Sequence, residues 1–280
     1  MLNAMLQIKC RVCGSNDFKQ WGCKNGSILY QCKHCELVFF YPYPSQKQLD
    51  DFYTNSSYHQ KRGYSGQNQA GELRKLMYGL DIADLEKHIP GGGKFLDVGC
   101  AEGLFLSHLK SAKWECYGMD VSETALEEAK RQTRGIHYFN AGIETIPTDD
   151  CFFDVIHMRG VFEHLLHPDG VIKALKKKLK IGGLLVLSNT PNIKSICAIL
   201  YRGRFKLVLP NEHVNYFSLK TIKVLSKNNN FSIKHVSYPY FGSPYESFFG
   251  DSFNLFRNLI TGEESPPYWG SIFTLYLKRR

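Results

Sequence analysis

The sequence predicts an α/β protein in which a doubly wound, mostly parallel sheet of seven strands follows a small N-terminal metal module. Three observations lead to this prediction. From residue 94 onward, short apolar runs alternate with amphipathic segments of helical period, as in parallel sheets that carry helices on both faces. The last two predicted strands are able to pair antiparallel at the edge of that sheet. Near the N-terminus, two Cys-x2-Cys pairs indicate a metal site.

Size and composition indicate a globular chain with an anionic partner. The 280 residues suffice for one large domain with a small appendage, and 43% hydrophobic against 22% charged residues excludes a disordered chain. No apolar run reaches the ~18–20 residues that span a bilayer, and residues 1–9 lack the features of a signal peptide. We therefore expect a cytoplasmic protein with reduced cysteines. A net charge of +9 suits a nucleotide-linked sugar, a phosphorylated metabolite or a nucleic acid.

The four paired cysteines match the spacing of a zinc ribbon. Cys10 and Cys13 form the first pair and Cys32 and Cys35 the second, with eighteen residues between the pairs. Two pairs of thiolates close a tetrahedral site that leaves no open position, so we expect structural Zn²⁺ in a module over residues 1–44. The alternatives are reduced cysteines in a small β module or a redox pair. A redox pair belongs at a strand–helix junction, which the sequence lacks here.

A linker and helical lid over residues 45–90 is predicted to join this module to the main domain, residues 91–280. Ser45 suits the N-cap of its first helix. Between its two helices lies a polar linker in which Tyr58 and Tyr64 either fold over a bound ligand or pack on the surface. The second helix is amphipathic and is expected to bury one face. Its expected core residues are Leu73, Leu76, Leu80, Ala83 and Leu85.

The other elements follow from the period of their apolar residues. Strands are expected over 19–21, 27–31, 95–98, 114–119, 136–140, 152–158, 184–189, 231–238 and 271–277, and helices over 45–53, 71–89, 104–110, 123–132, 168–180 and 221–227. Ser122 and Ser218 suit helix N-caps. The segment 240–269 is rich in Phe and Tyr and stands between the last two strands. It either covers an acceptor or forms a homodimer contact, and the sequence does not choose.

A glycine loop after the first central strand is the most informative functional feature. Gly99 and Gly103 have G-x-x-x-G spacing shortly after Asp97. About twenty residues beyond Gly99, Asp120 ends the next strand, where a carboxylate can accept hydrogen bonds from both hydroxyls of a ribose. A dinucleotide fingerprint needs G-x-G-x-x-G, and a pyrophosphate tolerates a nearby carboxylate poorly, whereas a cofactor with a free amino group favours one. The alternative is a glycine turn that binds nothing.

With these residues the sequence resembles the class I S-adenosylmethionine-dependent methyltransferases, whose first motif is an acidic residue followed by such glycines. The resemblance implies a Rossmann-like methyltransferase fold with S-adenosylmethionine as cofactor. It implies that Asp97 lies near the methionyl ammonium, directly or through water, and that Asp120 holds the ribose. It also implies that Gly142 and Ile143 lie beside the adenine. The complete cofactor set is Asp97, Gly99, Cys100, Ala101, Gly103, Asp120, Val121, Gly142, Ile143, Met158 and Arg159, the last two in the methionyl pocket.

The Glu163-His164 pair after the fourth central strand resembles a motif of small-molecule methyltransferases, and the chain is similar to sugar C-methyltransferases that carry an N-terminal zinc module. Methyl transfer to a hydroxyl needs a base, and histidine is the natural base near neutral pH. The resemblance therefore implies that His164 faces the acceptor. It makes His213 and Tyr216 acceptor-pocket candidates, with Glu163 ranked behind the histidines for catalysis. Both histidines have a plain alternative, in which they cap a helix or pack in a loop.

The expected function is methyl transfer from S-adenosylmethionine to a hydroxyl of a sugar or nucleotide-linked metabolite in surface polysaccharide or secondary metabolism. The alternative is an rRNA base methyltransferase with an N-terminal zinc site, which the positive charge permits. Against it, the chain lacks an Asn-Pro-Pro-Tyr-type motif, and the metal module lacks an Arg–aromatic stripe for stacking on bases. We therefore expect no nucleic-acid partner. A third possibility is a zinc-binding module on a degenerate fold, which the intact Asp97, Gly99, Gly103 and Asp120 disfavour.

Overall fold

The computed structural model describes residues 8–54, 69–89, 91–109, 113–210 and 212–280. Within these ranges, seven strands form one sheet in the order β10-β11-β8-β7-β4-β5-β6. The strands are β4 (Gly93–Val98), β5 (Trp114–Asp120), β6 (His137–Asn140), β7 (Phe153–Arg159), β8 (Leu179–Pro191), β10 (Phe231–Ser237) and β11 (Ile272–Arg279). Strands β6, β5, β4, β7 and β8 are parallel, whereas β11 is antiparallel to both β8 and β10. The predicted fold class is confirmed, while Tyr58 and Tyr64 lie outside the described residues.

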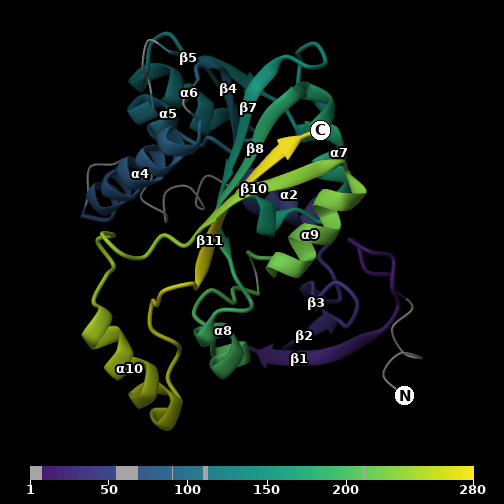
Figure 1. Ribbon diagram of the computed structural model, residues 1–280, viewed down its shortest axis with the longest axis vertical. Coiled ribbons are helices and arrows are strands. Elements are labelled where there is room, and N and C mark those ends of the chain that lie inside the picture. The colour runs from purple at the N-terminus through teal and green to yellow at the C-terminus, as the bar shows by residue number, and fades with distance from the viewer. Residues whose placement is uncertain (1–7, 55–68, 90, 110–112, 211) are drawn as a thin grey trace.

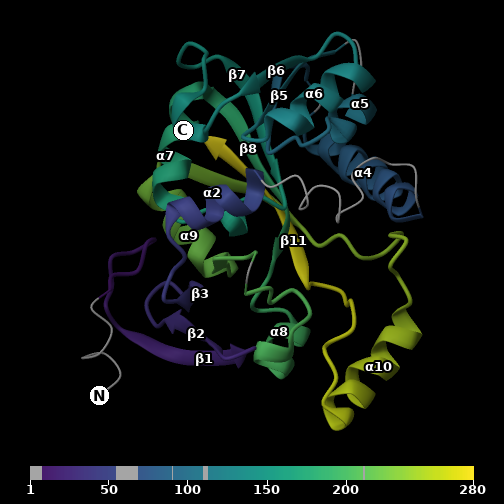
Figure 2. The same cartoon turned by 180° about the vertical axis from the view of Figure 1, so that it is seen from behind.

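Helices cover both faces of this sheet, as Figures 1 and 2 show. On one face lie α4 (Gln69–His88), α5 (Leu104–Leu109) and α6 (Glu123–Gln132), and on the other lie α7 (Pro168–Lys178) and α9 (Leu219–Asn228). The predicted caps are confirmed: the Ser122 and Ser218 hydroxyls accept hydrogen bonds from backbone N–H groups at the starts of α6 and α9. Ser45 caps α2 (Gln46–Thr54) in the same way. Because β4 lies where the strand order reverses, its carboxyl end is the expected ligand edge.

Helix α4 buries a different face from the one predicted. Leu76 and Leu80 are 59% and 36% exposed, and Ala83 is exposed as well. The helix instead turns a partly polar face to the sheet, on which Asp81 pairs with an arginine of β7. A buried charge pair of this kind decides the orientation of a helix more strongly than one leucine, because a buried unpaired charge is costly. The buried residues of this face are Met77, Tyr78, Asp81 and Leu85, so only Leu85 of the predicted core is fully buried.

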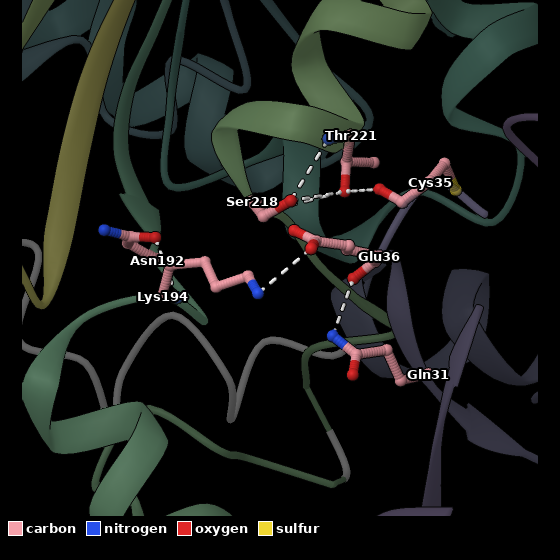
Figure 3. A network of polar contacts seen from close by, with 7 residues as sticks. All are labelled: Gln31, Cys35, Glu36, Asn192, Lys194, Ser218 and Thr221. Atoms are coloured by element: carbon pink, nitrogen blue, oxygen red, sulfur yellow. Dashed lines mark hydrogen bonds and ion pairs between the residues drawn. The ribbon is translucent and has the colours of Figure 1, made fainter. Parts of the chain in front are cut away.

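The N-terminal module shares a sheet with the second half of the chain. Its strands β1 (Phe18–Lys24), β2 (Ser27–Cys32) and β3 (Val38–Tyr41) pair antiparallel, and β9 (Asn215–Tyr216) adds to β3. Figure 3 shows polar contacts that join the two parts. The Thr221 hydroxyl of α9 donates to the Cys35 carbonyl at 2.8 Å, and Lys194 pairs with Glu36 at 3.0 Å. The packing therefore continues across the boundary expected at residue 44.

The aromatic segment 240–269 contains a helix that the sequence reasoning missed. Helix α10 (Phe248–Thr261) lies beside α8 (Ile196–Tyr201), away from the large sheet in both views. It buries Leu255 but leaves Phe249 88% exposed, together with other apolar side chains of the same helix. The homodimer contact expected for this segment stays a prediction. Among the described residues, no helix combines the length and the apolar character needed to cross a membrane.

Candidate active site and metal centre

The loop after β4 has the shape predicted from its glycines. Gly99 and Gly103 have φ angles of +74° and +73°, and Ala101 between them has φ +46°, so three residues lie in the left-handed region. A Cβ on Gly99 would lie 2.6 Å from a methyl of Val161, so glycine is also needed for packing. The Cys100 side chain is buried, and burial, with Asp120 and Asp97 nearby, raises the pKa of its thiol. The loop thus offers backbone rather than thiolate to a ligand.

Asp120 is held in place at the end of β5. Its Oδ2 accepts from the Ala101 N–H and its Oδ1 from the Ser122 N–H, both at 2.9 Å. These two contacts fix the orientation of the carboxylate, whose oxygens together have about four lone-pair sites. Asn140, which the sequence reasoning missed, donates from Nδ2 to the backbone carbonyls of Asp120 and Val121 at 3.2 and 3.1 Å. A ligand with two neighbouring hydroxyls fits these properties.

Apolar side chains flank this carboxylate. Val121 follows it directly and is 50% exposed, which is unusual for a valine at the end of a buried strand. Gly142 is exposed and precedes η1 (Ile143–Thr145), whose Ile143 is partly buried. Since Asp120 and Asn140 are paired residues of β5 and β6, these segments leave the sheet side by side. The arrangement suits a flat apolar ring next to a ribose.

Asp97 belongs to a buried chain of polar residues that crosses three strands. Its Oδ1 lies 2.9 Å from Nδ1 of His157 on β7, and Nε2 of His157 lies 2.7 Å from the hydroxyl of Ser188 on β8. The three residues are 3%, 1% and 2% exposed. With Asp97 ionised, Nδ1–H donates to the carboxylate and Ser188 donates to Nε2. The sequence analysis did not identify His157 and Ser188 as site residues. A histidine inside the apolar run after Asp154 was a visible signal for His157.

The two candidates at the end of β7 point in different directions. The Met158 side chain is fully buried in the core, and its predicted place in the methionyl pocket stays a prediction. The two side chains differ because strand alternation turns neighbouring residues to opposite faces. Arg159 is directed to α4, where its Nε donates to Asp81 at 2.6 Å and its guanidinium lies over the Tyr78 ring at 4.8 Å. Asp81 and Tyr78 were not predicted as site residues.

The three catalytic candidates come together. Their possible ligand atoms, on Glu163, His164 and His213, all lie within 4.8 Å of one another. The segment before β9 causes this convergence, because the Val214 N–H donates to the Glu163 carbonyl at 2.9 Å. Nε2 of His213 lies 4.0 Å from Oε1 of Glu163, and the two imidazole centroids are 4.8 Å apart. His164 is partly exposed, whereas Glu163 and His213 are buried. Tyr216 is buried too, with its ring 5.7 Å from that of His213.

Backbone contacts set which nitrogen of each ring is basic. Nδ1 of His164 lies 2.6 Å from the Glu212 carbonyl, and Nδ1 of His213 lies 3.0 Å from the Leu207 carbonyl. A carbonyl only accepts, so Nδ1 carries the proton in both rings and Nε2 keeps its lone pair. Tyr53 of α2 also contacts His164, with 2.7 Å between its hydroxyl and Nδ1. The cluster therefore presents a partly exposed imidazole whose Nε2 is able to take a proton.

Comparison with known proteins agrees with this geometry. The profile of a methyltransferase-domain family matches residues 72–236, which is more than half of the chain. The chain belongs to this family. Among its curated relatives is a ubiquinone biosynthesis O-methyltransferase of Idiomarina loihiensis, 34% identical over 135 residues, which are 45% of this chain and 56% of the relative. Another is a demethylmenaquinone methyltransferase of Staphylococcus haemolyticus, 29% identical over 136 residues, with 45% and 55% covered.

This methyltransferase-family chain spans about half the length of the curated relatives it matches. Solved structures cover more of it. An S-adenosylmethionine-dependent methyltransferase of Thermotoga maritima has a TM-score of 0.58 at 17% identity, with 83% of this chain and 100% of that chain covered. A magnesium protoporphyrin IX methyltransferase of Synechocystis PCC 6803 with bound S-adenosylmethionine has a TM-score of 0.56 at 14% identity, covering 85% and 99%. These identities show the fold alone.

The methyltransferase-family fold is joined to a four-cysteine centre. The Sγ atoms of Cys10, Cys13, Cys32 and Cys35 all lie within 4.8 Å of one another. The Sγ–Sγ distances are 3.4 Å for Cys10–Cys35 and 3.5 Å for Cys13–Cys32. Zn–S bonds of about 2.3 Å in a tetrahedron place the sulfurs about 3.8 Å apart, so the four thiols fit a zinc ion.

The close approach of the sulfurs also shifts the pKa values of three of these thiols. Hydrogen bonds with Cys10 and Cys35 lower the pKa of Cys32. Hydrogen bonds with Cys10 and Cys32 raise the pKa of Cys35, and hydrogen bonding to Cys32 raises the pKa of Cys10 to about 12. These shifts favour the thiolate form of Cys32 and the protonated forms of Cys10 and Cys35. Four thiolates at this spacing need a positive ion between them.

Proposed function

We propose that this protein transfers a methyl group from S-adenosylmethionine to a hydroxyl oxygen of a small-molecule acceptor. The observation that carries the proposal is that cofactor-type and base-type residues meet at one edge of the sheet. The Gly99–Gly103 loop and Asp120 follow β4 and β5, and His164 follows β7, which pairs with β4. Membership of the methyltransferase-domain family supports the same reaction class.

The residues of the cofactor edge each have a role. Asp120 accepts from the ribose hydroxyls, Asp97 faces the methionyl ammonium, and the open backbone between Gly99 and Gly103 admits the amino-acid part. Val121 contacts the adenine, which suits its exposure. When bound, S-adenosylmethionine supplies a methyl group on a cationic sulfur. The protein's part is to align the acceptor oxygen with that methyl, since alignment removes much of the entropy cost of a displacement.

His164 is the proposed base. Its Nδ1–H is held by the Glu212 carbonyl, so Nε2 is free of the proton and accepts the one that the acceptor hydroxyl loses. His213 is more buried, and its Nε2 faces Glu163, so it orients the cluster rather than meeting the acceptor. Glu163 helps to hold the two imidazoles together.

The acceptor class is proposed from the relatives and the surroundings of His164. One relative is named as an O-methyltransferase of ubiquinone biosynthesis and another as a demethylmenaquinone methyltransferase. The rings of Tyr53 and His213 lie 5.4 and 4.8 Å from that of His164, a setting suited to an aromatic hydroxyl. These names mention neither a sugar nor an rRNA acceptor. The net charge of +9 suits a phenol that carries a carboxylate.

A labelled-methyl assay tests this function. Purified protein is incubated with methyl-labelled S-adenosylmethionine and three acceptor sets: hydroxylated benzoates and related phenols, nucleotide-linked sugars, and rRNA. We expect label in an O-methyl product of a phenol, detected by mass spectrometry, and at least about 100-fold slower labelling with His164→Ala. Label only in sugars would keep the methyl transfer and overturn the acceptor class. Label only in rRNA, or on carbon, would overturn the hydroxyl proposal.

A further inference from the structure

A second group of metal-ligand side chains lies apart from both sites described above. Asp84 and His88 of α4 and His235 of β10 have ligand atoms that all lie within 4.8 Å of one another. They are at the outer edge of the large sheet, because β10 is its last strand. His235 is exposed and Asp84 and His88 are partly exposed, so the cluster lies near the surface.

The local sequence explains how the three side chains meet. Asp84 and His88 are four residues apart on one helix, so they lie on the same face, one turn from each other. His235 reaches them through an irregularity of β10. The pairing of β10 with β11 shifts register between Ile233 and His235. With the shift, Ile233 and Val236 both pack against one core cluster, while His235 and Ser237 face α4.

The carboxylate of this cluster is already oriented by neighbouring hydroxyls. Asp84 Oδ2 accepts from the Ser237 hydroxyl at 2.8 Å and from the Tyr276 hydroxyl at 2.7 Å. Hydroxyls that hold a carboxylate in this way are typical of the outer contacts of metal ligands, which orient the ligand and raise its affinity. They occupy one oxygen, so the other oxygen remains for a cation.

The two histidines give a separate reason to expect an ion. Their ring centroids are only 3.8 Å apart and the rings are nearly perpendicular, at 87°. Within the described part of the chain, the buried Nε2 of His88 has no hydrogen-bond partner. A buried polar atom of this kind calls for an explanation, because leaving it unpaired costs free energy. A cation bound at this nitrogen would pair with its lone pair.

We propose that Asp84, His88 and His235 form a binding site for a divalent transition metal of the zinc type, separate from the four-cysteine centre. Two imidazoles and one carboxylate are ligands that Zn²⁺, Ni²⁺ and Co²⁺ favour over Mg²⁺ or Ca²⁺. Tetrahedral Zn²⁺ needs ligand atoms about 3.3 Å apart, so on binding the side chains close from a spacing of up to 4.8 Å. Water completes the coordination, since the site lies near the surface. The ion would fasten the C-terminal end of α4 to the edge strand.

A metal link between α4 and β10 is relevant to the methyltransferase site, because α4 also borders the edge of the sheet that is proposed to bind the cofactor. One turn before Asp84, Asp81 of the same helix holds Arg159 at 2.6 Å. A helix fixed at its C-terminal end moves less along its length, so metal binding at this edge stabilises the position of Asp81. The site is therefore placed to act on stability and on the position of α4, not on the chemistry of methyl transfer.

Zinc titration of the full-length protein tests the site. The cysteine centre is first saturated with Zn²⁺, weakly held metal is removed by gel filtration, and further Zn²⁺ is titrated by calorimetry with Mg²⁺ as the comparison ion. We expect one additional Zn²⁺ equivalent, no Mg²⁺ binding at the same concentration, and a higher melting temperature with Zn²⁺. His235→Ala should weaken the affinity for this additional Zn²⁺ at least about tenfold, because one ligand is lost. Since His235 is exposed, the variant should fold normally.

His137→Ala is the matched control. His137 is an exposed histidine on β6, the strand at the opposite edge of the same sheet. This variant should bind the additional Zn²⁺ with wild-type affinity. Equal zinc binding by wild type and His235→Ala would overturn the site, as would the absence of an additional equivalent in the wild type. An equal loss in His137→Ala would mean that the zinc binds surface histidines in general, which also overturns it.

Discussion

Replacing His157 with leucine tests whether Asp97 is held for the cofactor ammonium. His157 is the partner through which Asp97 is joined to Ser188, and all three side chains are buried. Leucine fills a similar volume but donates no hydrogen bond. Asp97 then takes up a proton or turns to another donor, and in both cases it is no longer directed to the ammonium. His157→Asn is the matched variant, because its side-chain amide is able to donate in place of Nδ1–H.

The size of the effect follows from the contacts. A hydrogen bond to a charged group contributes about 1.5–3 kcal/mol, which is roughly a 10- to 150-fold change in affinity. His157→Leu should therefore weaken binding of S-adenosylhomocysteine by about this factor. Methylthioadenosine lacks the amino-acid part, so its affinity should barely change. Because the variant leaves a buried carboxylate without its partner, its free energy of unfolding should also fall by about 3–5 kcal/mol.

Calorimetric titration with both nucleosides measures this difference directly. The ratio of the two affinities is the critical quantity, because general damage to the fold lowers both affinities by the same factor. His157→Asn should restore most of the ratio. An unchanged ratio in folded His157→Leu would refute the role of His157 in orienting Asp97. If the leucine variant does not fold, Ser188→Ala, which removes only the far contact, should lower the ratio by a smaller factor, and no change there would refute the role as well.

Three further predictions concern other parts of the molecule. The purified protein should contain about one zinc in its cysteine centre, and the double substitution Cys32→Ser, Cys35→Ser should lose it by elemental analysis; metal retained there would contradict the centre. His164→Ala should lower turnover about 10²–10⁴-fold with nearly unchanged affinity for S-adenosylhomocysteine, and wild-type turnover should rise with pH as imidazole loses its proton. His213→Ala should affect turnover less, and the reverse order would contradict the assignment of the base. Thr221→Val should lower the free energy of unfolding by about 1–3 kcal/mol in urea denaturation, because the Cys35 carbonyl loses a buried donor; an unchanged value would show that this contact adds nothing.

Much of the fold was predictable because the signals that specify it are local. The N-caps at Ser122 and Ser218 lie where the sequence predicts them. A capping hydroxyl accepts a hydrogen bond from a backbone N–H in the first turn of the helix that follows it, so the signal is local. The glycine loop and Asp120 were also predictable, because each follows a recognisable strand. The carboxyl ends of parallel strands meet at one edge of the sheet. The cysteine spacing also predicted the four-thiol cluster, whose sulfurs do converge.

The residues that were missed depend on contacts between distant segments. Nothing near His157 in the sequence shows that Ser188 will lie beside it on the neighbouring strand. The buried face of α4 depends on Arg159, which follows Asp81 by 78 residues. Strand β9 is only two residues long and forms because β3 has a free edge, so its own sequence carries almost no strand signal. Helix α10 was not predicted, because the aromatic composition of segment 240–269 indicates a cover over the acceptor or a homodimer contact rather than a helix.

Binding of S-adenosylhomocysteine to the wild type and to Asp120→Ala tests the central claim, that the ends of β4 and β5 hold the cofactor. Asp149→Ala is the control, because Asp149 is an exposed aspartate outside the site. Titration calorimetry should show one site in the wild type and in the control, no heat with NAD, and about 10- to 150-fold weaker binding in Asp120→Ala, the scale of lost hydrogen bonds to a carboxylate. No binding to the wild type, or equal affinity in Asp120→Ala, would contradict the account.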